Sequence, residues 1–370
     1  MSKENPSPDD GDAPATPLRR GWTTGACATA AAKAAYSALL GGGEFPDPVT
    51  IRLPGGQEPA FALAIHGMEG ERAFAGIVKD AGDDPDVTHG ALVVVHVGHG
   101  PEGAGVLFRA GAGVGTVTRP GLPIPPGEPA INPVPRRMIS EAIAGVAARF
   151  GASGDVIVEV SIADGAELAG KTLNPRLGIV GGLSVLGTTG IVIPFSCSAW
   201  IHSIHRGIDV ARASGLTHIA GSTGSTSEAA VAKLYGLPEV ALIDMGDFVG
   251  GMLKYVRAHP VERVTIAGGF AKMVKLGQGL LDLHSARGEV DLNWLADLAA
   301  RSGADQTLAD AIRSANSALH GLMLCREVGF AIGDHVARAA LVTAAKAVAG
   351  SGIMLDVVVF DREGQPTGRA

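Results

Sequence analysis

The sequence predicts two domains, an α+β domain at residues 18–151 and a mainly parallel α/β domain with helices on both faces at residues 152–370. The chain has 370 residues, more than the roughly 250–300 that a single hydrophobic core accommodates. From residue 155 onward, short apolar runs alternate with helical patterns, which is typical of a parallel sheet covered on both faces. The 53 glycines and an aromatic content of 4% indicate layers that pack closely through small side chains.

Charge and cysteine usage exclude several classes of protein. The net charge is −7 and the sequence has no basic run, so nucleic acid is not expected as the main partner, while a local basic pocket stays open. Cys27, Cys197 and Cys325 lie far apart, which favours neither a disulfide framework nor a zinc site and fits a reducing cytoplasm. Residues 1–17 are acidic and proline-rich without an apolar core, so we expect a disordered tail rather than a signal peptide.

The first domain begins with an alanine-rich helix. Its expected N-cap is Thr23 or Thr24, and the glycines from Gly41 onward end it. Strands bounded by Gly, Pro and Asp are expected at residues 49–56, 58–70, 72–80 and 90–100, the first two as a hairpin. A second helix opens with Pro133 in its first turn and ends at Gly151.

The second domain is predicted from the alternation of strand and helix patterns. Its strands are continuous apolar runs, as a sheet buried on two faces requires. The expected strands lie at residues 156–162, 217–221, 240–245, 263–269 and 353–361. Helices are expected at residues 225–236 and 247–260, and helical segments between residues 292 and 350 are expected to cover the sheet.

The longest uncharged stretch runs from Leu177 to Ile201 and is rich in Gly, Ser and Thr. It exceeds the roughly 20 residues that a transmembrane helix needs. The glycines between Gly178 and Gly190, together with Pro194, would break such a helix, and the hydroxyl groups would need partners within lipid. We therefore expect a buried, backbone-rich loop that binds a ligand, and no membrane partner.

Two nucleotide motifs match by their letters but not by their context. Gly165–Thr172 has the spacing of a phosphate-binding loop, yet Pro175 follows too closely for the helix that such a loop opens. Gly98–Gly103 has the spacing of a dinucleotide fingerprint, but Pro101 interrupts it, and the acidic residue expected about twenty residues later is missing. A phosphate-loop nucleotide enzyme stays an alternative function.

Turns at residues 221–224, 244–247 and 268–270 follow successive strands of the second domain. The carboxyl ends of parallel strands meet at one edge, where open α/β sheets bind ligands. Glycine in these turns lets a flat adenosine come close, while Asp244 offers an acceptor for a ribose or an amino group. Ser225 and Glu228 also have capping-box spacing, a purely structural alternative for the first turn.

Titratable residues gather in two further places. The loop after Lys79 carries Asp80, Asp83, Asp84 and Asp86. Their spacing is not that of a calcium hand, so we expect either a solvated turn or a site where crowding raises the pKa of a carboxylate toward that of a general base. His202, His205 and Asp209 have helical spacing, for which a polar stripe is favoured over a metal site, and no metal is expected.

Seven segments, taken in this order, resemble the cobalt-precorrin-5B C(1)-methyltransferase family of cobalamin biosynthesis. They are GWTTGACATAAAKAA, VKDAGDDPDVT, INPVPRRMI, TLNPRLGIVGGLSVLGTTGIVIPFS, STGSTSE, GDFVGG and GGFAKMVKLGQG, and the resemblance covers residues 19–360. It implies transfer of a methyl group from S-adenosylmethionine to carbon C1 of a ring-contracted cobalt corrinoid. It also implies that the second domain is Rossmann-like. A non-catalytic tetrapyrrole-binding protein is the alternative from another class.

The resemblance, combined with the chemistry of the ligands, gives roles to particular residues. Those expected to hold S-adenosylmethionine are Gly181, Gly182, Ser184, Thr188, Thr189, Gly221, Ser222, Thr223, Gly224, Asp244, Asp247, Gly268 and Gly269. The corrinoid carries many carboxylates, and the residues expected to bind it are Arg19, Arg20, Thr23, Thr24, Lys33, Arg136 and Arg137. A base, where one is required, is expected among Asp80, Asp84 and His205. The sequence leaves homo-oligomer formation open.

Overall fold

The computed structural model describes residues 17–370, so the tail expected at residues 1–17 lies outside the described residues except for its last one. The described chain divides into two compact units. Unit 1 takes in the chain up to Gly111, Val134–Asp164 and Val185–Phe195, and unit 2 takes in Ala112–Pro133, Gly165–Ser184 and Ser196–Ala370. The domain boundary predicted at residue 151 falls inside a segment that belongs wholly to unit 1.

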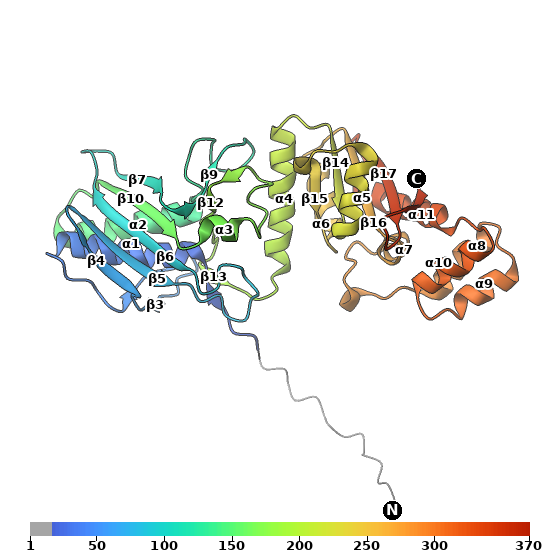
Figure 1. Cartoon of the computed structure of the whole chain (residues 1–370), viewed down its shortest axis with the longest axis horizontal. Coiled ribbons are helices and arrows are strands. Elements are labelled where there is room, and N and C mark those ends of the chain that lie inside the picture. The colour runs from blue at the N-terminus through green and yellow to red at the C-terminus, as the bar shows by residue number, and fades with distance from the viewer. Residues whose placement is uncertain (1–16) are drawn as a thin grey trace, which may run out of the picture. The chain divides into compact units, whose positions relative to one another are not determined.

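Unit 1 is built on a mixed sheet with the strand order β4-β5-β6-β10-β7 (Figure 1). Its strands are β4 (Ile65–Glu69), β5 (Arg72–Val78), β6 (Leu92–His99), β10 (Val156–Ile162) and β7 (Val106–Ala110). Side chains alternate between the faces of a sheet, and the register partners Ala75, Val95 and Val160 are all buried on one of them. Helix α1 (Thr24–Leu40) packs against β5 and β6, and its buried alanines allow this close approach.

Helices α1 and α2 begin where the sequence predicts them to begin. Thr23 is the N-cap of α1, with Oγ1 accepting from the N–H of Ala26 at 3.2 Å, and Gly41 is its C-cap. Helix α2 (Pro133–Phe150) begins at the predicted proline. The hairpin expected before β4 is shorter than predicted, and the short antiparallel pairs here are β2 (Val49–Thr50) with β3 (Ala60–Phe61) and β1 (Gly21–Trp22) with β13 (Ile191–Val192).

Strand β10 differs from its prediction, because it belongs to unit 1 rather than opening the second sheet. It pairs antiparallel with β6 and parallel with β7. Its residues alternate between buried and half-buried, as in a sheet with one covered face. The apolar run Val156–Ile162 resembles a strand buried on both faces, so its composition alone does not reveal which sheet it joins.

Unit 2 contains a second sheet with the order β15-β14-β16-β17-β18 (Figure 1). Its strands are β14 (His218–Ser222), β15 (Leu242–Asp244), β16 (Arg263–Gly269), β17 (Met354–Phe360) and β18 (Pro366–Arg369). β14 is parallel to β15 and β16, and β16 is parallel to β17, whereas β18 is antiparallel to β17. β14 to β17 lie where the sequence predicts strands, and β18 was not predicted.

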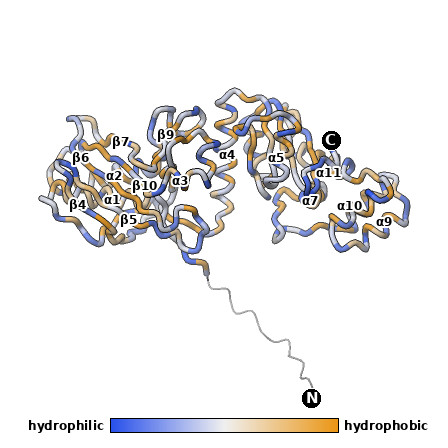
Figure 2. The backbone as a smooth tube through the Cα atoms, viewed as in Figure 1, coloured by the Kyte–Doolittle hydropathy of each residue, from blue (hydrophilic) through white to orange (hydrophobic). Residues whose placement is uncertain are grey.

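Helices cover both faces of the unit 2 sheet. On one face, Val231 of α5 (Ser225–Tyr235) packs with Ala220 and Val358 of the strands. On the other face, Ile219 and Ile266 pack in a core with α4, α6, α7 and α11. These helices are α4 (Cys197–Ala213), α6 (Val249–Ala258), α7 (Phe270–Gly277) and α11 (Ile332–Ala347). Figure 2 shows the hydrophobic stretches within the strands and helices of each unit.

The helical region expected between residues 292 and 350 is confirmed. It consists of α8 (Leu292–Arg301), α9 (Gln306–Arg313), α10 (Ala318–Glu327) and α11. Asp291, Asp305 and Ser317 cap the first three of these helices through side-chain oxygens. Short 3-10 turns, η1 (Glu239–Ala241) and η2 (Ser285–Arg287), complete the unit.

The long uncharged stretch contains the short strands β11 (Ile179–Val180), β12 (Gly182–Leu183) and β13, and it is not helical before α4 begins. Unit 2 contains three further small elements, β8 (Gly113–Val114), β9 (Thr116–Val117) and α3 (Gly165–Ala169). β11 pairs antiparallel with β9, and β12 pairs parallel with β8. Within residues 17–370, no helix combines the length and the apolar character that crossing a membrane requires.

Replacing Gly333 by alanine is expected to destabilise unit 2. A Cβ at Gly333 would lie 1.9 Å from the backbone oxygen of Thr367, so α11 and β18 would have to separate. Such overpacking costs about 1–3 kcal/mol, which urea unfolding would show as a lower midpoint. Gly269→Ala is the control, since its φ is −66° and a Cβ there would meet no described atom within 4 Å. Equal stability of the two variants would contradict the packing described.

Candidate functional site

The carboxyl ends of β14, β15 and β16 meet at one edge of the unit 2 sheet because these strands are parallel. After β14 the chain first adds β15 on one side and then β16 on the other. Open α/β sheets bind ligands in the crevice at such a reversal. The turn that leaves β14 is tied to β16 by a hydrogen bond of 3.0 Å from the N–H of Thr223 to the oxygen of Ala267.

The glycines of these turns are of two kinds. A Cβ at Gly221 would lie 2.2 Å from the Sδ of Met252, and one at Gly268 would meet a side-chain atom at 2.5 Å, so both glycines face the packed interior. At Gly224 and Gly269, by contrast, a Cβ would meet none of the described atoms within 4 Å. These two open glycines are the N-caps of α5 and α7.

A cavity of about 370 Å³ lies at this edge of the sheet. The hydroxyl-bearing Thr223 and Ser225 line it together with Phe270, Phe360 and Arg362. Its size falls within the range of roughly 300–1,000 Å³ that is usual for small-molecule sites. Thr223 is a predicted site residue, whereas the two phenylalanines are not, because each has the sequence pattern of an ordinary strand end or helix start.

Asp244 ends β15 beside Ser222, its register partner on β14. Burial, followed by the charge of Glu228, raises the pKa of Asp244 above its ordinary value. The Oγ of Ser222 is fully buried and has no hydrogen-bond partner within the described part of the chain. A half-buried carboxylate and a hydroxyl without a partner thus adjoin at the strand tips.

The capping-box alternative for the first turn is wrong. Gly224 rather than Ser225 is the N-cap of α5. Glu228 pairs with Arg176 through bonds of 2.8 and 2.9 Å. The serines and threonines of this turn are therefore not explained by helix capping.

The carboxylate of Asp247, in the turn after β15, is already paired with a lysine. It forms an ion pair with Lys272, whose Nζ also donates to the oxygen of Leu283 at 3.2 Å. A ligand that binds Asp247 would have to share it with this lysine.

The uncharged segment is divided between the units. In unit 2, Gly181 is exposed, and a Cβ at Gly182 would lie 2.3 Å from the backbone of Gly113. The hydroxyl of Ser184 is buried and donates to the Oδ1 of Asn174 at 3.2 Å. This half of the segment therefore packs mainly against protein.

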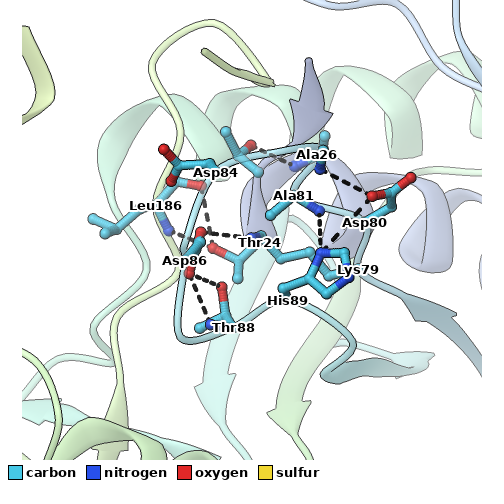
Figure 3. Close-up of polar contacts among 12 residues, drawn as sticks. Thr24, Ala26, Lys79, Asp80, Ala81, Asp84, Asp86, Thr88, His89 and Leu186 are labelled. Atoms are coloured by element: carbon cyan, nitrogen blue, oxygen red, sulfur yellow. Dashed lines mark hydrogen bonds and ion pairs between the residues drawn. The ribbon is translucent and has the colours of Figure 1, made fainter. Parts of the chain in front are cut away.

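The other half of the segment lies on the N-terminus of α1 (Figure 3). The oxygen of Leu186 accepts from the N–H of Gly25 at 2.8 Å, and its N–H donates to the Oγ1 of Thr24 at 2.9 Å. These bonds satisfy backbone groups that a helix start leaves open. Thr188 and Thr189 follow and are exposed.

The acidic loop lies beside the same helix start (Figure 3). Lys79 is only 1% exposed, and its Nζ lies 2.6 Å from the Oδ2 of Asp86. The other oxygen of Asp86 accepts from the N–H and the Oγ1 of Thr88 at 2.7 and 2.6 Å. Burial alone would raise the pKa of Asp86, but Lys79 and Thr88 together lower it. This buried pair fixes the path of the loop.

The expectation of a raised carboxylate pKa in this loop is wrong for Asp80 as well. Hydrogen bonds from Arg19 and from the N–H of Gly82 lower the pKa of Asp80 to about 2. Asp84 accepts from the N–H of Phe195 at 2.8 Å. At Asp80 the effect of crowding on the pKa is outweighed by these two donors.

The cations expected to bind the corrinoid all lie in unit 1. Arg19 is paired with a carboxylate, and Lys33 donates to a backbone oxygen at 2.6 Å. The guanidinium of Arg136 lies 5.2 Å from the centre of an aromatic ring, and Arg137 lies 3.9 Å from a carboxylate oxygen. Arg20 is exposed.

His205 lies on α4 in unit 2, stacked on Tyr255 with ring centres 3.8 Å apart. Burial, followed by the charges of His202 and Arg206, lowers the pKa of His205. The hydroxyl of Tyr255 donates to Asp209 at 2.8 Å. Among the described residues, no three His, Cys, Asp or Glu side chains are grouped to hold a metal ion.

The phosphate-loop spacing falls on the short helix α3 and the turns after it. A Cβ at Gly165 would lie 2.2 Å from the oxygen of Gly113, so this glycine is needed for packing. The Nζ of Lys171 lies 3.3 Å from Glu167 on the surface. Residues after Thr172 form turns, as expected from the nearby Pro175.

Comparison with known proteins gives a consistent match. Residues 12–194 match the CbiD family model, and residues 282–370 match the model of the CbiD C-terminal domain. The chain is 66% identical to a Bradyrhizobium protein, 63% to one from Agrobacterium fabrum and 62% to one from Paramagnetospirillum magneticum, each named cobalt-precorrin-5B C(1)-methyltransferase. Each alignment covers 95% of this chain, and 94%, 93% and 98% of the respective relative.

A crystal structure of the cobalamin biosynthesis protein (cbiD) from Archaeoglobus fulgidus is also similar. It is 29% identical and covers 73% of this chain and 83% of its own. The TM-score is 0.40, too low for this structure to serve as a template for the fold.

Substitutions of the buried pair are expected to differ in effect. Asp86→Asn leaves the buried charge of Lys79 without its partner, which costs roughly 3–5 kcal/mol of unfolding free energy. Lys79→Met is expected to cost less, because Asp86 is 26% exposed and keeps its bonds to Thr88. Urea unfolding measures both.

The exposed pair of Lys171 with Glu167 provides the control. Lys171→Met is expected to change stability by less than about 1 kcal/mol. If Asp86→Asn were as mild as this surface variant, the loop would not depend on the buried pair.

Proposed function

The chain belongs to the CbiD family, and we propose that it transfers a methyl group from S-adenosylmethionine to carbon C1 of cobalt-precorrin-5B, giving cobalt-precorrin-6A. The observation that carries the proposal is the identity of 62–66% to relatives named for this reaction, over 95% of the chain. The first family match covers unit 1 and part of unit 2, and the second lies within unit 2. Both units therefore contain sequence that is typical of the family.

We place the methyl donor at the carboxyl edge of the unit 2 sheet and regard this sheet as Rossmann-like. Gly224 ends the turn after the first parallel strand, and Asp244 ends the next strand. Dinucleotide-binding folds place a ribose-binding acid at the same place, about twenty residues after the glycine turn. The open space at Gly224 and Gly269, the half-buried carboxylate and the hydroxyl of Ser222 without a partner fit a nucleoside with a polar tail.

S-adenosylmethionine supplies a methyl group on a positively charged sulfur. In this proposal, the N–H groups at the starts of α5 and α7 bind its carboxylate, and Asp244 accepts hydrogen bonds from its ribose. Phe270 and Phe360, which line the cavity, keep water away. An environment poor in water and charge favours this transfer, because the positive charge disperses in the transition state.

Unit 1 is our proposed site for the corrinoid. Arg20, Lys33, Arg136 and Arg137 are the proposed partners of its carboxylates, and Arg19 would have to exchange Asp80 for the substrate. Thr188 and Thr189 are exposed on the same unit, and the hydroxyl of Thr189, which donates to the backbone oxygen of Ile191 at 3.2 Å, would have to exchange this bond for one to the substrate. Because carbon C1 belongs to the substrate's own conjugated ring, positioning is the main task of these residues.

Methylation at carbon adds one positive charge, which loss of a proton balances. Asp80 is a weak base for this proton, because Arg19 and Gly82 hold its pKa at about 2. His205 is neutral at neutral pH because its pKa is lowered, so it can accept a proton. We therefore propose His205 before Asp80 as the base, and Asp84 stays a further candidate.

The two alternatives each have a distinct signature. A phosphate-loop nucleotide enzyme would need Lys171, which instead lies on the surface beside Glu167. A non-catalytic tetrapyrrole-binding protein would bind the corrinoid without turnover.

Incubation with methyl-labelled S-adenosylmethionine and cobalt-precorrin-5B is expected to place the label on carbon C1 of the corrinoid product. Mass spectrometry and NMR of the product measure this. Lys171→Ala is the control and is expected to keep the wild-type rate. Binding of the corrinoid without label transfer would instead indicate a carrier, and loss of the rate in Lys171→Ala would favour the nucleotide enzyme.

Asp244→Asn is expected to stabilise the protein at neutral pH while weakening the binding of S-adenosylhomocysteine. Loss of a charged hydrogen bond costs roughly 1.5–3 kcal/mol, or about 10- to 150-fold in affinity. Calorimetric titration measures the affinity, and thermal unfolding measures the stability.

The stability gained by Asp244→Asn is expected to depend on pH, which tests whether the Asp244 carboxylate is its source. The pKa of Asp244 is raised in the folded protein, so its ionised form opposes folding above that pKa. As the pH falls through the folded pKa toward the ordinary value of 3.8, the carboxyl becomes neutral and the gain from asparagine shrinks. A gain that grew on acidification would show that another group is responsible.

A further inference from the structure

Trp200 is held against the tip of β15 from the first turns of α4. Its Nε1–H donates to the backbone oxygen of Asp244 at 3.2 Å. A Cβ at Gly246 would lie 3.4 Å from three adjoining indole atoms, Cε2, Cζ2 and Nε1, which places this glycine on one side of the ring plane. Gly246 has a φ of +50°, so the turn approaches the indole with a backbone geometry that favours glycine.

The indole is unusually open for a tryptophan. It is 46% exposed although one side adjoins Gly246 and its polar edge is already bonded. Tryptophan is highly buried on average, and an exposed ring anchored beside polar groups is typical of a binding surface. The bond to Asp244 accounts for the orientation of the indole but not for its open surface.

The groups around Trp200 select the kind of ligand. The backbone oxygen that holds the indole belongs to Asp244, whose own carboxylate is half-buried, and Ser222 is the register partner of Asp244 on the adjoining strand. Glu228 is already paired with Arg176, so the cation there is occupied. An open aromatic ring anchored on a residue that also carries a half-buried carboxylate fits a flat, uncharged base attached to a diol.

We propose that Trp200 is the adenine platform of this site, with the base stacked on the exposed indole while Asp244 binds the ribose of the same nucleoside. This inference rests on the proposed function and deepens it, because it names the residue that recognises the adenosine half of the methyl donor. Trp200 is thus a binding residue, remote from the reacting methyl group.

Fluorescence tests the contact directly. Trp200 becomes the sole tryptophan when Trp22 and Trp294 are replaced by phenylalanine. Titration with S-adenosylhomocysteine or with adenosine is expected to quench its emission and to saturate, because a stacked base quenches indole. Homocysteine, which has no base, is expected to leave the emission unchanged. Saturating binding of S-adenosylhomocysteine without any change in emission would overturn the proposal.

Affinity in the otherwise natural chain provides the second test, independent of how well the sole-tryptophan variant folds. Trp200→Leu is expected to bind S-adenosylhomocysteine roughly 5- to 150-fold more weakly, since stacking of one base is worth that much. Trp200→Phe keeps an aromatic ring and is expected to recover most of the loss. Trp294→Phe, on α8, is the matched control and is expected to bind like the wild type.

The outcomes separate this inference from the proposed function. If Trp200→Leu binds S-adenosylhomocysteine as tightly as Trp294→Phe does and transfers the labelled methyl group normally, the platform is refuted while the methyltransferase proposal stands. If the wild-type chain neither binds S-adenosylhomocysteine nor transfers the label, the proposed function itself fails. Weaker binding in Trp200→Leu with recovery in Trp200→Phe supports the platform.

Discussion

The parallel pairing of β14 with β15 and β16 is the constraint on which the candidate donor site depends. Because three strands run in the same direction, the turns that leave them emerge at one edge, although they lie more than twenty residues apart in the chain. Buried apolar residues on both faces of the sheet hold this alignment. The same packing places Gly221 against Met252 and leaves Gly224 open, so one turn contains both a tightly packed glycine and an open one.

In unit 1, a loop rich in carboxylates lies against the start of helix α1. Lys79 is buried away from water and pairs with Asp86. Asp80 accepts from Arg19, and Asp84 accepts from a backbone N–H. Hydrogen bonds from Arg19 and from the N–H of Gly82 favour the ionised form of Asp80, which is why Asp80 is a poorer base than its crowded position indicates.

Much of the fold could be predicted from local patterns, because caps and apolar periodicity act over a few residues. Thr23 and Pro133 begin helices where the sequence places them. The partners of a strand, however, depend on distant residues, so β10 was assigned to the wrong sheet. In the same way, sequence spacing identified Asp244 as a candidate but gave no role to Trp200, because the contact between them joins residues 44 apart.

The methyl donor is proposed to bind at the carboxyl edge of the unit 2 sheet. A crystal structure of the complex with S-adenosylhomocysteine tests it most directly. We expect the nucleoside beside Asp244 and the amino acid tail near Gly224 and Gly269. A nucleoside bound on unit 1, or at the opposite end of the unit 2 strands, would contradict it.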